Sequence, residues 1–294
     1  MLSILIPIYN FNSSELVKEL NSQALELGIE FEILCYDDNS TIVYQENKEL
    51  SSLENTKYNY LEKNHGRSAI RNLLANDAQY PYLLFLDCDG KIPSVNFLSH
   101  YIRNKDEADI ICGGRIYPSR KEVKPKEYLH WIYGIKRESK CNQEDARSFM
   151  TNNFLISKQA FLSTQLDTSM SGYGHEDTIF GIELKKKGYS FKIIKNPVIH
   201  LGLYDNDCFL KNTRNSIDNL NKIIGSKYKE EEFFDIKLVK IFSLSKRLKL
   251  ISLLGYLYSK TNKSLERNLK SKNPNLFLLD LYKLGYYSYI NLID

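Results

Sequence analysis

The feature that most constrains the fold is an alternation of short apolar runs with helical patterns over the first third of the chain. Candidate strands occupy residues 3–8, 31–36, 57–61 and 82–86; the first is a candidate for a buried strand, and the last is continuous and apolar. The segments at residues 12–28 and 66–78 repeat apolar residues at helical spacing. Strands that alternate with helices indicate a parallel sheet covered on both faces, which binds ligands beyond the carboxyl ends of its strands.

The first of these helical segments carries its own start and stop signals. Asn12 followed by Glu15 has the spacing of a capping box, and Gly28 ends the pattern. Its expected apolar face consists of Leu16, Leu20, Leu25 and Leu27. The sequence therefore predicts one amphipathic helix between the first two strands.

The remaining two thirds of the chain are less regular. A block with two glycines, Gly172-Tyr173-Gly174-His175-Glu176-Asp177, opens a predicted helix that runs to Gly188. Short strands are expected at residues 191–194 and 198–201. Beyond about Asp205 the pattern is helical, at first polar and then apolar and basic.

Charge and cysteine content exclude several classes of protein. The net charge of +4 is too small to indicate a nucleic-acid binder. The five cysteines are widely spaced without a CxxC pair, which argues against a disulfide framework and against a zinc cluster. The N-terminus lacks the basic region of a signal peptide, and no window has the roughly 18 apolar residues of a membrane span. We therefore expect a cytoplasmic protein.

Two carboxylates follow the fourth predicted strand in Asp87-Cys88-Asp89. Acids one residue apart can reach one hard cation, directly or through water, and such a cation stabilises the charge of a diphosphate leaving group. An ordinary acidic turn is the alternative interpretation, because Asp and Gly both favour turns.

Other polar residues at strand ends and helix starts are compatible with a nucleotide site. Asp38, in the segment after the second strand, could accept an N–H bond from a nucleobase. Arg67 and Arg71 lie one helical turn apart and could both face a diphosphate, although a solvated helix face is the alternative.

Glu176 and Asp177 stand at a predicted helix start, and three lysines stand at its end. This charge distribution complements the helix dipole, which is a sufficient structural explanation. A carboxylate stabilised by the dipole would also stay ionised near neutral pH and could act as a general base. His200 is either a third metal ligand or a hydrogen-bonded structural residue.

Taken together, these segments resemble glycosyltransferase family 2 proteins of GT-A fold over roughly residues 1–205. The donor-binding half is similar in residues 3–10, 37–40, 64–72 and 86–89. The block from Gly172 to Asp177 resembles the Gly-Trp-Gly-x-Glu-Asp segment of chondroitin-polymerase-like enzymes and β-1,4-galactosyltransferases, with Tyr173 in place of Trp. The resemblance implies an α/β GT-A domain, with its donor half at about 1–115 and its catalytic half at about 116–205. Residues 206–294 would form a helical extension.

The resemblance also implies roles for individual residues. Enzymes of that branch are inverting and use UDP-sugars with a divalent cation, here Mn²⁺ with Mg²⁺ as the alternative. Asp89 and His200 would hold the metal, and Asp87 would contact the donor sugar or ribose. Glu176 would hold the acceptor, and Asp177 would deprotonate it. The nucleoside would bind near Pro7, Tyr9 and Asp38.

The expected function is therefore transfer of a sugar to a glycan or a lipid-linked saccharide, in surface polysaccharide synthesis. Two alternatives are a sugar-1-phosphate nucleotidyltransferase and a carbohydrate-binding relic of a transferase. The nucleotidyltransferase would need a Gly-rich, basic loop after the first strand, whereas residues 9–12 contain neither Gly nor Lys. Retention of Asp89, Asp177 and His200 argues against the relic.

The C-terminal extension differs from the rest of the chain in charge. Residues 236–294 contain eleven Lys or Arg and three acids, a net charge of +8, whereas residues 1–235 carry −4. Residues 236–265 contain no acid and interleave bases with leucines and tyrosines, which predicts a basic helix on the surface of an anionic membrane. The alternative is that the leucines pack on the catalytic domain or on a second subunit.

Overall fold

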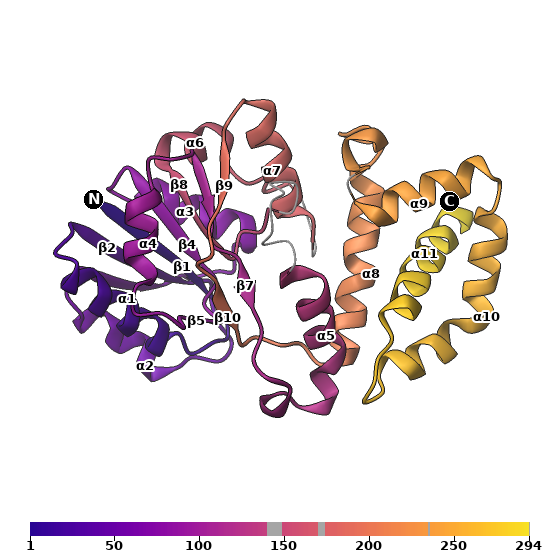
Figure 1. Cartoon of the computed structure of the whole chain (residues 1–294), viewed down its shortest axis with the longest axis horizontal. Helices are drawn as coiled ribbons and strands as arrows, with labels where there is room; N and C mark the ends of the chain where they lie inside the picture. The colour runs from indigo at the N-terminus through magenta and orange to yellow at the C-terminus, as the bar shows by residue number, and fades with distance from the viewer. Residues whose placement is uncertain (140–148, 170–173, 235, 294) are drawn as a thin grey trace. The chain divides into compact units, whose positions relative to one another are not determined.

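A computed structural model describes residues 1–139, 149–169, 174–234 and 236–293 (Figure 1). The chain divides into two compact units. The sheet unit consists of Met1–Pro118, Arg137–Ser169 and Glu176–Gly202. The helical unit consists of Ser119–Lys136, a short segment ending at His175, and Leu203–Asp294. Residues 119–136 thus join the helical unit, although the sequence assigned them to the catalytic half of the first domain.

The sheet unit is built on a seven-stranded sheet with the order β3-β2-β1-β4-β8-β6-β9. Its strands are β1 (Leu2–Ile8), β2 (Phe31–Asp37), β3 (Thr56–Tyr60), β4 (Tyr82–Leu86), β6 (Ile110–Cys112), β8 (Asn153–Ser157) and β9 (Phe191–Ile193). The first four are mutually parallel, and β8 runs antiparallel to both β4 and β6. The expected mostly parallel sheet is confirmed.

Helices cover both faces of this sheet (Figure 1). One face packs against α1 (Ser14–Glu26) and α4 (Phe97–Asn104), and the other packs against α3 (Arg67–Asp77), α6 (Lys158–Thr164) and α7 (Glu176–Lys186). The side chains of β1 alternate between the two cores, with Ile4 and Ile6 in the first and Leu5 in the second. This alternation explains why β1 reads as a continuous apolar run.

The start of α1 differs from its sequence prediction. The N-cap is Ser13, which makes no side-chain capping bond, and Asn12 instead accepts a hydrogen bond from the Ser14 amide at 3.1 Å. The predicted capping box of Asn12 and Glu15 is therefore wrong. The stop signal is confirmed, because Gly28 follows the helix with a φ of +59°.

The apolar face of α1 was predicted only in part. Leu16 and Leu20 are buried in the core, whereas Leu25 and Leu27 are exposed. Val17 and Ala24 lie in the core with Leu20. These three residues are spaced by three and four positions and therefore share one helix face.

A three-stranded sheet adjoins the end of β4. Its strands are β5 (Gly90–Lys91), β7 (Arg115–Ile116) and β10 (Val198–His200), in the order β5-β10-β7. Strand β10 runs antiparallel to β5, with His200 opposite Gly90, and parallel to β7. This small sheet joins three segments that lie far apart in the sequence.

The helical unit contains α5 (Tyr128–Lys136), α8 (Asn206–Ile223), α9 (Lys237–Arg247), α10 (Ile251–Leu269) and α11 (Leu276–Ile293). Helix α11 packs against α8, α9 and α10 (Figure 1). The single basic helix predicted for residues 236–265 is wrong, because Leu248–Leu250 separates α9 from α10 and Lys249 has a φ of +57°. Shorter helical segments in the described part of the chain include α2 (Gln45–Lys48) and the 3₁₀ turns Glu49–Ser52, Arg120–Glu122, Pro125–Glu127 and Glu230–Phe233.

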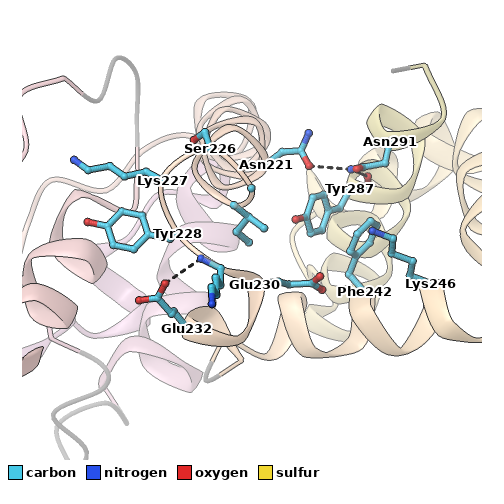
Figure 2. Close-up of a pocket in the computed structure, with 13 residues that line it drawn as sticks. Asn221, Ser226, Lys227, Tyr228, Glu230, Glu232, Phe242, Lys246, Tyr287 and Asn291 are labelled. Carbon is cyan, nitrogen blue, oxygen red and sulfur yellow. Dashed lines mark hydrogen bonds between the residues drawn. The ribbon is translucent and has the colours of Figure 1, made fainter.

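A cavity of about 570 Å³ lies inside the helical unit (Figure 2). It is lined by the end of α8, the segment after it, α9 and α11. Phe242 and Tyr287 stack beside it with ring centroids 3.9 Å apart, and Asn291 donates a hydrogen bond to Asn221. One oxygen of Glu230 is buried here without a hydrogen-bond partner.

Candidate active site

Asp89 and His200 lie side by side at the junction of the two sheets. Asp89 follows β4 in a turn closed by a hydrogen bond from the Gly90 amide to the Asp87 carbonyl at 3.1 Å. His200 ends β10, opposite Gly90, and its Nδ1 lies 3.4 Å from Oδ1 of Asp89. The backbone also joins the two segments, because the Leu201 amide donates to the Asp89 carbonyl at 2.9 Å. The structure thus brings together the two residues for which the sequence predicts metal binding.

The chemistry of this pair fits a divalent cation. Oδ1 of Asp89 is buried, and the long contact with His200 is not a well-formed hydrogen bond, so the carboxylate has a lone pair available to a ligand. Burial raises the pKa of Asp89, but the charge and the polar contact of His200, together with the charges of Arg115 and Arg67, outweigh it and hold the pKa below its usual value. A Cβ atom at Gly202 would collide with the other oxygen of this carboxylate. Among the described residues no group of three or more His, Cys, Asp or Glu could hold a metal, so further ligands would come from a bound substrate or water.

Asp87 is held by an arginine from α3. Its Oδ1 lies 2.5 Å from Nη2 of Arg71, and Arg71 is buried. Nη1 of the same guanidinium donates to the carbonyl of Arg67 at 3.0 Å. Arg71 therefore orients Asp87 instead of lying on a solvated helix face. Its predicted contact with a diphosphate stays a prediction.

Asp38 ties down the segment that leads into α3. Its two carboxylate oxygens accept hydrogen bonds from the amides of His65 at 2.7 Å and Gly66 at 2.9 Å. The side chain is buried, so these bonds fix the first turn of α3, where Arg67 stands. The predicted reading of a nucleobase by Asp38 stays a prediction. Beyond the end of β1, the ring of Tyr9 is exposed and accessible to a ligand.

Asp177 stands in the first turn of α7 and carries a perturbed carboxylate. Burial and the charge of Glu176 raise the pKa of Asp177 to about 7, against the smaller opposing effects of the Thr178 amide and of Arg115 and Arg67. The Thr178 amide donates to Oδ1 of Asp177 at 2.7 Å. A pKa of about 7 leaves the group partly ionised near neutral pH, so its ionisation and its role as a base stay predictions. Burial dominates, and it gives Asp177 a pKa near neutrality.

Two arginines connect the carboxylates of the site. Nη1 of Arg67 lies 3.5 Å from Oε1 of Glu176, which joins the start of α3 to the start of α7. Arg67 and Arg115 lower the pKa of both Asp89 and Asp177. Because Coulomb interactions fall off with distance, the expected metal ligand and the expected base share one cationic environment.

A second set of residues around His200 escaped the sequence analysis. Arg115, on β7, lies with Nη1 3.4 Å from Oε2 of Glu138, and the hydroxyl of Tyr117 donates to the same carboxylate. The Tyr117 ring contacts the His200 ring edge-on, with centroids 5.6 Å apart. The sequence does contain a pattern that could have indicated Arg115 as a site residue. In Gly113-Gly114-Arg115, a glycine pair and then a base directly follow strand β6.

Asn153, at the start of β8, joins the segments that carry Arg115 and His200. Its side-chain amide donates to the carbonyls of Gly114 and Asn196, both at 2.9 Å, and its Oδ1 accepts from the Tyr101 hydroxyl at 2.6 Å. The side chain is fully buried, and every polar atom has a partner. Of the glycine block before α7, Gly172 and Tyr173 lie outside the described residues, so the Tyr173 substitution has no structural account.

The first part of the chain is similar to a known protein family. A family model described as glycosyl transferase family 2 matches residues 3–163. This segment contains Asp38, Asp87 and Asp89 and ends before Asp177 and His200. No curated protein matches the chain.

Solved structures share the fold at low sequence identity. A mannosyltransferase from Pyrobaculum calidifontis, in complex with GDP-Man and Mn²⁺, is 12% identical with a TM-score of 0.57. The similarity covers 99% of this chain and 86% of that one. S. aureus TarS 1–349 in complex with UDP-GlcNAc is 16% identical with a TM-score of 0.50, over 99% of this chain and 91% of that one. Since the family model spans more than half of the chain, the protein belongs to glycosyl transferase family 2.

Proposed function

We propose that this glycosyltransferase is an inverting, metal-dependent enzyme that moves a sugar from a UDP-sugar to a hydroxyl of a glycan or lipid-linked acceptor. The observation that carries the proposal is the pairing of Asp89 with His200 within one unit that also contains Asp177. Direct displacement inverts the anomeric carbon and needs two functions, a stabilised leaving group and a base for the acceptor. The pair and Asp177 would supply one each.

Asp89 and His200 would hold the divalent cation. Such a cation neutralises the charge that develops on a nucleoside diphosphate as its bond to the sugar breaks. A ligand set of one carboxylate and one imidazole favours Mn²⁺ over Mg²⁺, because Mg²⁺ prefers oxygen ligands. The Mn²⁺ in the complex of the P. calidifontis mannosyltransferase supports this choice.

Asp177 would accept the proton of the attacking hydroxyl. A base is most effective when its pKa lies near the working pH, and burial raises the pKa of Asp177 to about 7. Glu176, which Arg67 keeps in place, would hold the acceptor. Asp87, oriented by Arg71, would bind the donor sugar or ribose, while Pro7, Tyr9 and Asp38 would surround the nucleoside.

The proposal also names a class of donor and a class of acceptor. UDP as the nucleotide rests on the resemblance of the Gly172–Asp177 block, and the UDP-GlcNAc complex of TarS supports it. The GDP-Man complex of the other neighbour makes GDP-sugars the necessary comparison. A hexose or an N-acetylhexosamine would be transferred, and we propose a role in surface polysaccharide synthesis.

A donor screen by nucleotide release, with and without Mn²⁺, tests the proposal. We expect signal from one UDP-sugar, loss of signal with EDTA, and an inverted anomeric configuration in the product by NMR. Asp89→Ala should abolish turnover, whereas Asp106→Ala, at an exposed carboxylate, should not. Activity that survives EDTA or Asp89→Ala would contradict the metal assignment, and a retained configuration would contradict inversion.

The same screen separates the two alternatives. A sugar-1-phosphate nucleotidyltransferase would release pyrophosphate from UTP and would release no UDP from a UDP-sugar. A carbohydrate-binding relic would bind a saccharide without turnover of any donor.

A further inference from the structure

The corner between α9 and α10 combines exposed apolar side chains with a high density of bases. Helix α9 ends at Arg247, α10 begins at Ile251, and the chain turns between them at Lys249. Both helices pack on α11. Phe242 and Tyr258 are buried in this packing, against residues of α11. Packing within the helical unit therefore accounts for part of the apolar content of this segment.

The remaining apolar residues of the corner are exposed. They are Leu244, Leu248, Leu250, Leu253, Tyr256 and Leu257, with exposed fractions between 39% and 59%. They fall within the fourteen positions from 244 to 257: one lies on α9, three lie on α10, and Leu248 and Leu250 lie in the turn between the helices. Large apolar side chains that are exposed in such density mark candidate interaction sites. We call these six residues, with the neighbouring bases, the corner surface.

The bases of the corner surface have no acidic neighbours in the sequence. Lys246, Arg247, Lys249 and Lys260 are all exposed, and residues 236–265 contain neither Asp nor Glu. Lys260 lies over the ring of Tyr256, with Nζ 5.6 Å from the ring centroid. An occupant of this surface must therefore be apolar where the leucines lie and anionic around them.

We propose that the corner surface docks on an anionic lipid membrane, with its leucines at the boundary of headgroups and acyl chains. The bases would then lie at the level of the anionic headgroups. None of the helices in the described part of the chain is long and apolar enough to cross a membrane, so the contact is superficial. A second copy of the chain is a poorer occupant, because a two-fold interface would bring two sets of these bases together.

Co-sedimentation of the full chain with vesicles tests this proposal. The vesicles are phosphatidylcholine alone, or phosphatidylcholine mixed with phosphatidylglycerol, each at low and high salt. We expect binding to the mixed vesicles only, and weaker binding at high salt. Binding to both vesicle types alike, or to neither, would overturn the proposal.

Two pairs of substitutions at exposed positions separate the contributions. Lys246→Gln with Lys249→Gln should weaken binding to mixed vesicles about thirtyfold, since each base near such a surface contributes about fivefold. Leu248→Ser with Leu253→Ser should abolish sedimentation even at low salt. The matched controls are Lys91→Gln with Lys121→Gln, and Ile42→Ser with Val95→Ser, all exposed and remote in sequence.

Two further measurements keep the result interpretable. Circular dichroism and melting curves of each variant establish that its fold is intact. Analytical ultracentrifugation without lipid tests self-association. A dimer of the wild-type chain that Leu248→Ser with Leu253→Ser dissociates would overturn the proposal in favour of an interface between copies. Turnover of the sugar donor in solution should be equal in all four variants. If the variants show no difference in vesicle binding, the docking proposal is contradicted, but the glycosyltransferase proposal is not.

Discussion

Among single residues, Asp177 has the most direct chemical consequence, because its raised pKa of about 7 falls within the range in which an enzyme works. Below that pH the carboxyl is protonated and cannot accept a proton from the acceptor. We therefore expect kcat/KM to rise about tenfold per pH unit up to about pH 7 and to level off above it. Steady-state rates between about pH 5 and pH 9 measure this profile.

Asp177→Asn provides the control for this profile. The variant should lose about 10²–10⁴-fold in kcat with little change in UDP binding, and its residual rate should no longer follow the same titration. The substitution should not lower the melting temperature. A raised pKa means that folding disfavours the ionised carboxylate, so any stabilisation by Asn should be larger at pH 8 than at pH 5.5. If the variant keeps half of the wild-type rate, Asp177 is not the general base, and its carboxylate serves only the first turn of the helix.

Gly202 tests the geometry of the expected metal site without removing a ligand. A methyl group there would collide with Oδ2 of Asp89 and turn the carboxylate away from His200. We expect Gly202→Ala to weaken Mn²⁺ binding about 10–100-fold, a range typical of changes next to metal ligands. Titration calorimetry with Mn²⁺ measures the effect, and Leu201→Ala, at an exposed neighbour, is the matched control. Equal Mn²⁺ affinity in both variants would contradict a site at Asp89.

At the scale of secondary-structure elements, the packing around β8 decides how firmly the site is built. Asn153→Ala would remove the buried donor of the Asn196 carbonyl and the closest acceptor of Tyr101, and it would leave the Gly114 carbonyl with the Val198 amide alone. An unsatisfied buried polar group costs about 1–3 kcal/mol, so the free energy of unfolding should fall by several kcal/mol. Urea titration measures this loss.

Asn21→Ala is the control for Asn153→Ala. Asn21 also donates from a buried side chain, to the Glu54 carbonyl and to Thr56, at the start of β3. Both variants should be destabilised, but only Asn153→Ala should also reduce the activity of the folded fraction. Equal retention of activity would mean that Asn153 supports the fold without orienting Arg115 or His200.

A second element, the turn Glu230–Phe233, carries an unsatisfied group of its own. Oε1 of Glu230 is buried beside the cavity without a hydrogen-bond partner. The pKa of Tyr287 is raised to about 12, mainly by burial of its hydroxyl and to a smaller extent by the charge of Glu230. Replacing this carboxylate by an amide of the same shape, Glu230→Gln, should raise the melting temperature by a few degrees. Scanning calorimetry measures the melting temperature, and Glu231→Gln, at an exposed neighbour, is the control. A lower melting temperature for Glu230→Gln than for the wild-type chain would show that the carboxylate of Glu230 is stabilised in solution.

The elements also show where sequence reasoning succeeds and where it stops. Strands β1, β2 and β4 were predictable because both of their faces are buried, so each is a nearly continuous apolar run. Strand β3 is partly exposed and includes Lys57 and Asn59, so its own pattern is weaker. The start of α1 and the break at Lys249 were harder, since a local hydrogen bond decides the first and a single positive φ decides the second. The role of Asn153 and the group around Arg115 could not be predicted, because they depend on tertiary contacts between remote segments.

At the scale of the whole molecule, the division into two units assigns different physical tasks to different parts of the sequence. The sheet unit contains every residue expected to bind the donor or the metal, whereas the corner surface belongs to the helical unit. The family model covers residues 3–163, which include parts of both units. Under the two proposals above, changes in the helical unit would alter where the enzyme works and leave its chemistry unchanged.

The pairing of His200 with Gly90 has a consequence for the order in which the molecule assembles. Strands β1 to β4 are joined by short crossovers, but β5 meets β10 only after more than a hundred intervening residues have been placed. Contacts between such distant segments close late in folding, because the entropy of the intervening loop must be overcome first. We expect the transition state to lack the Asp89–His200 pair. Mn²⁺ should then slow unfolding without accelerating refolding, which stopped-flow chevron measurements with and without the ion would reveal. An enzyme of this kind would acquire its metal as the last step of its own maturation.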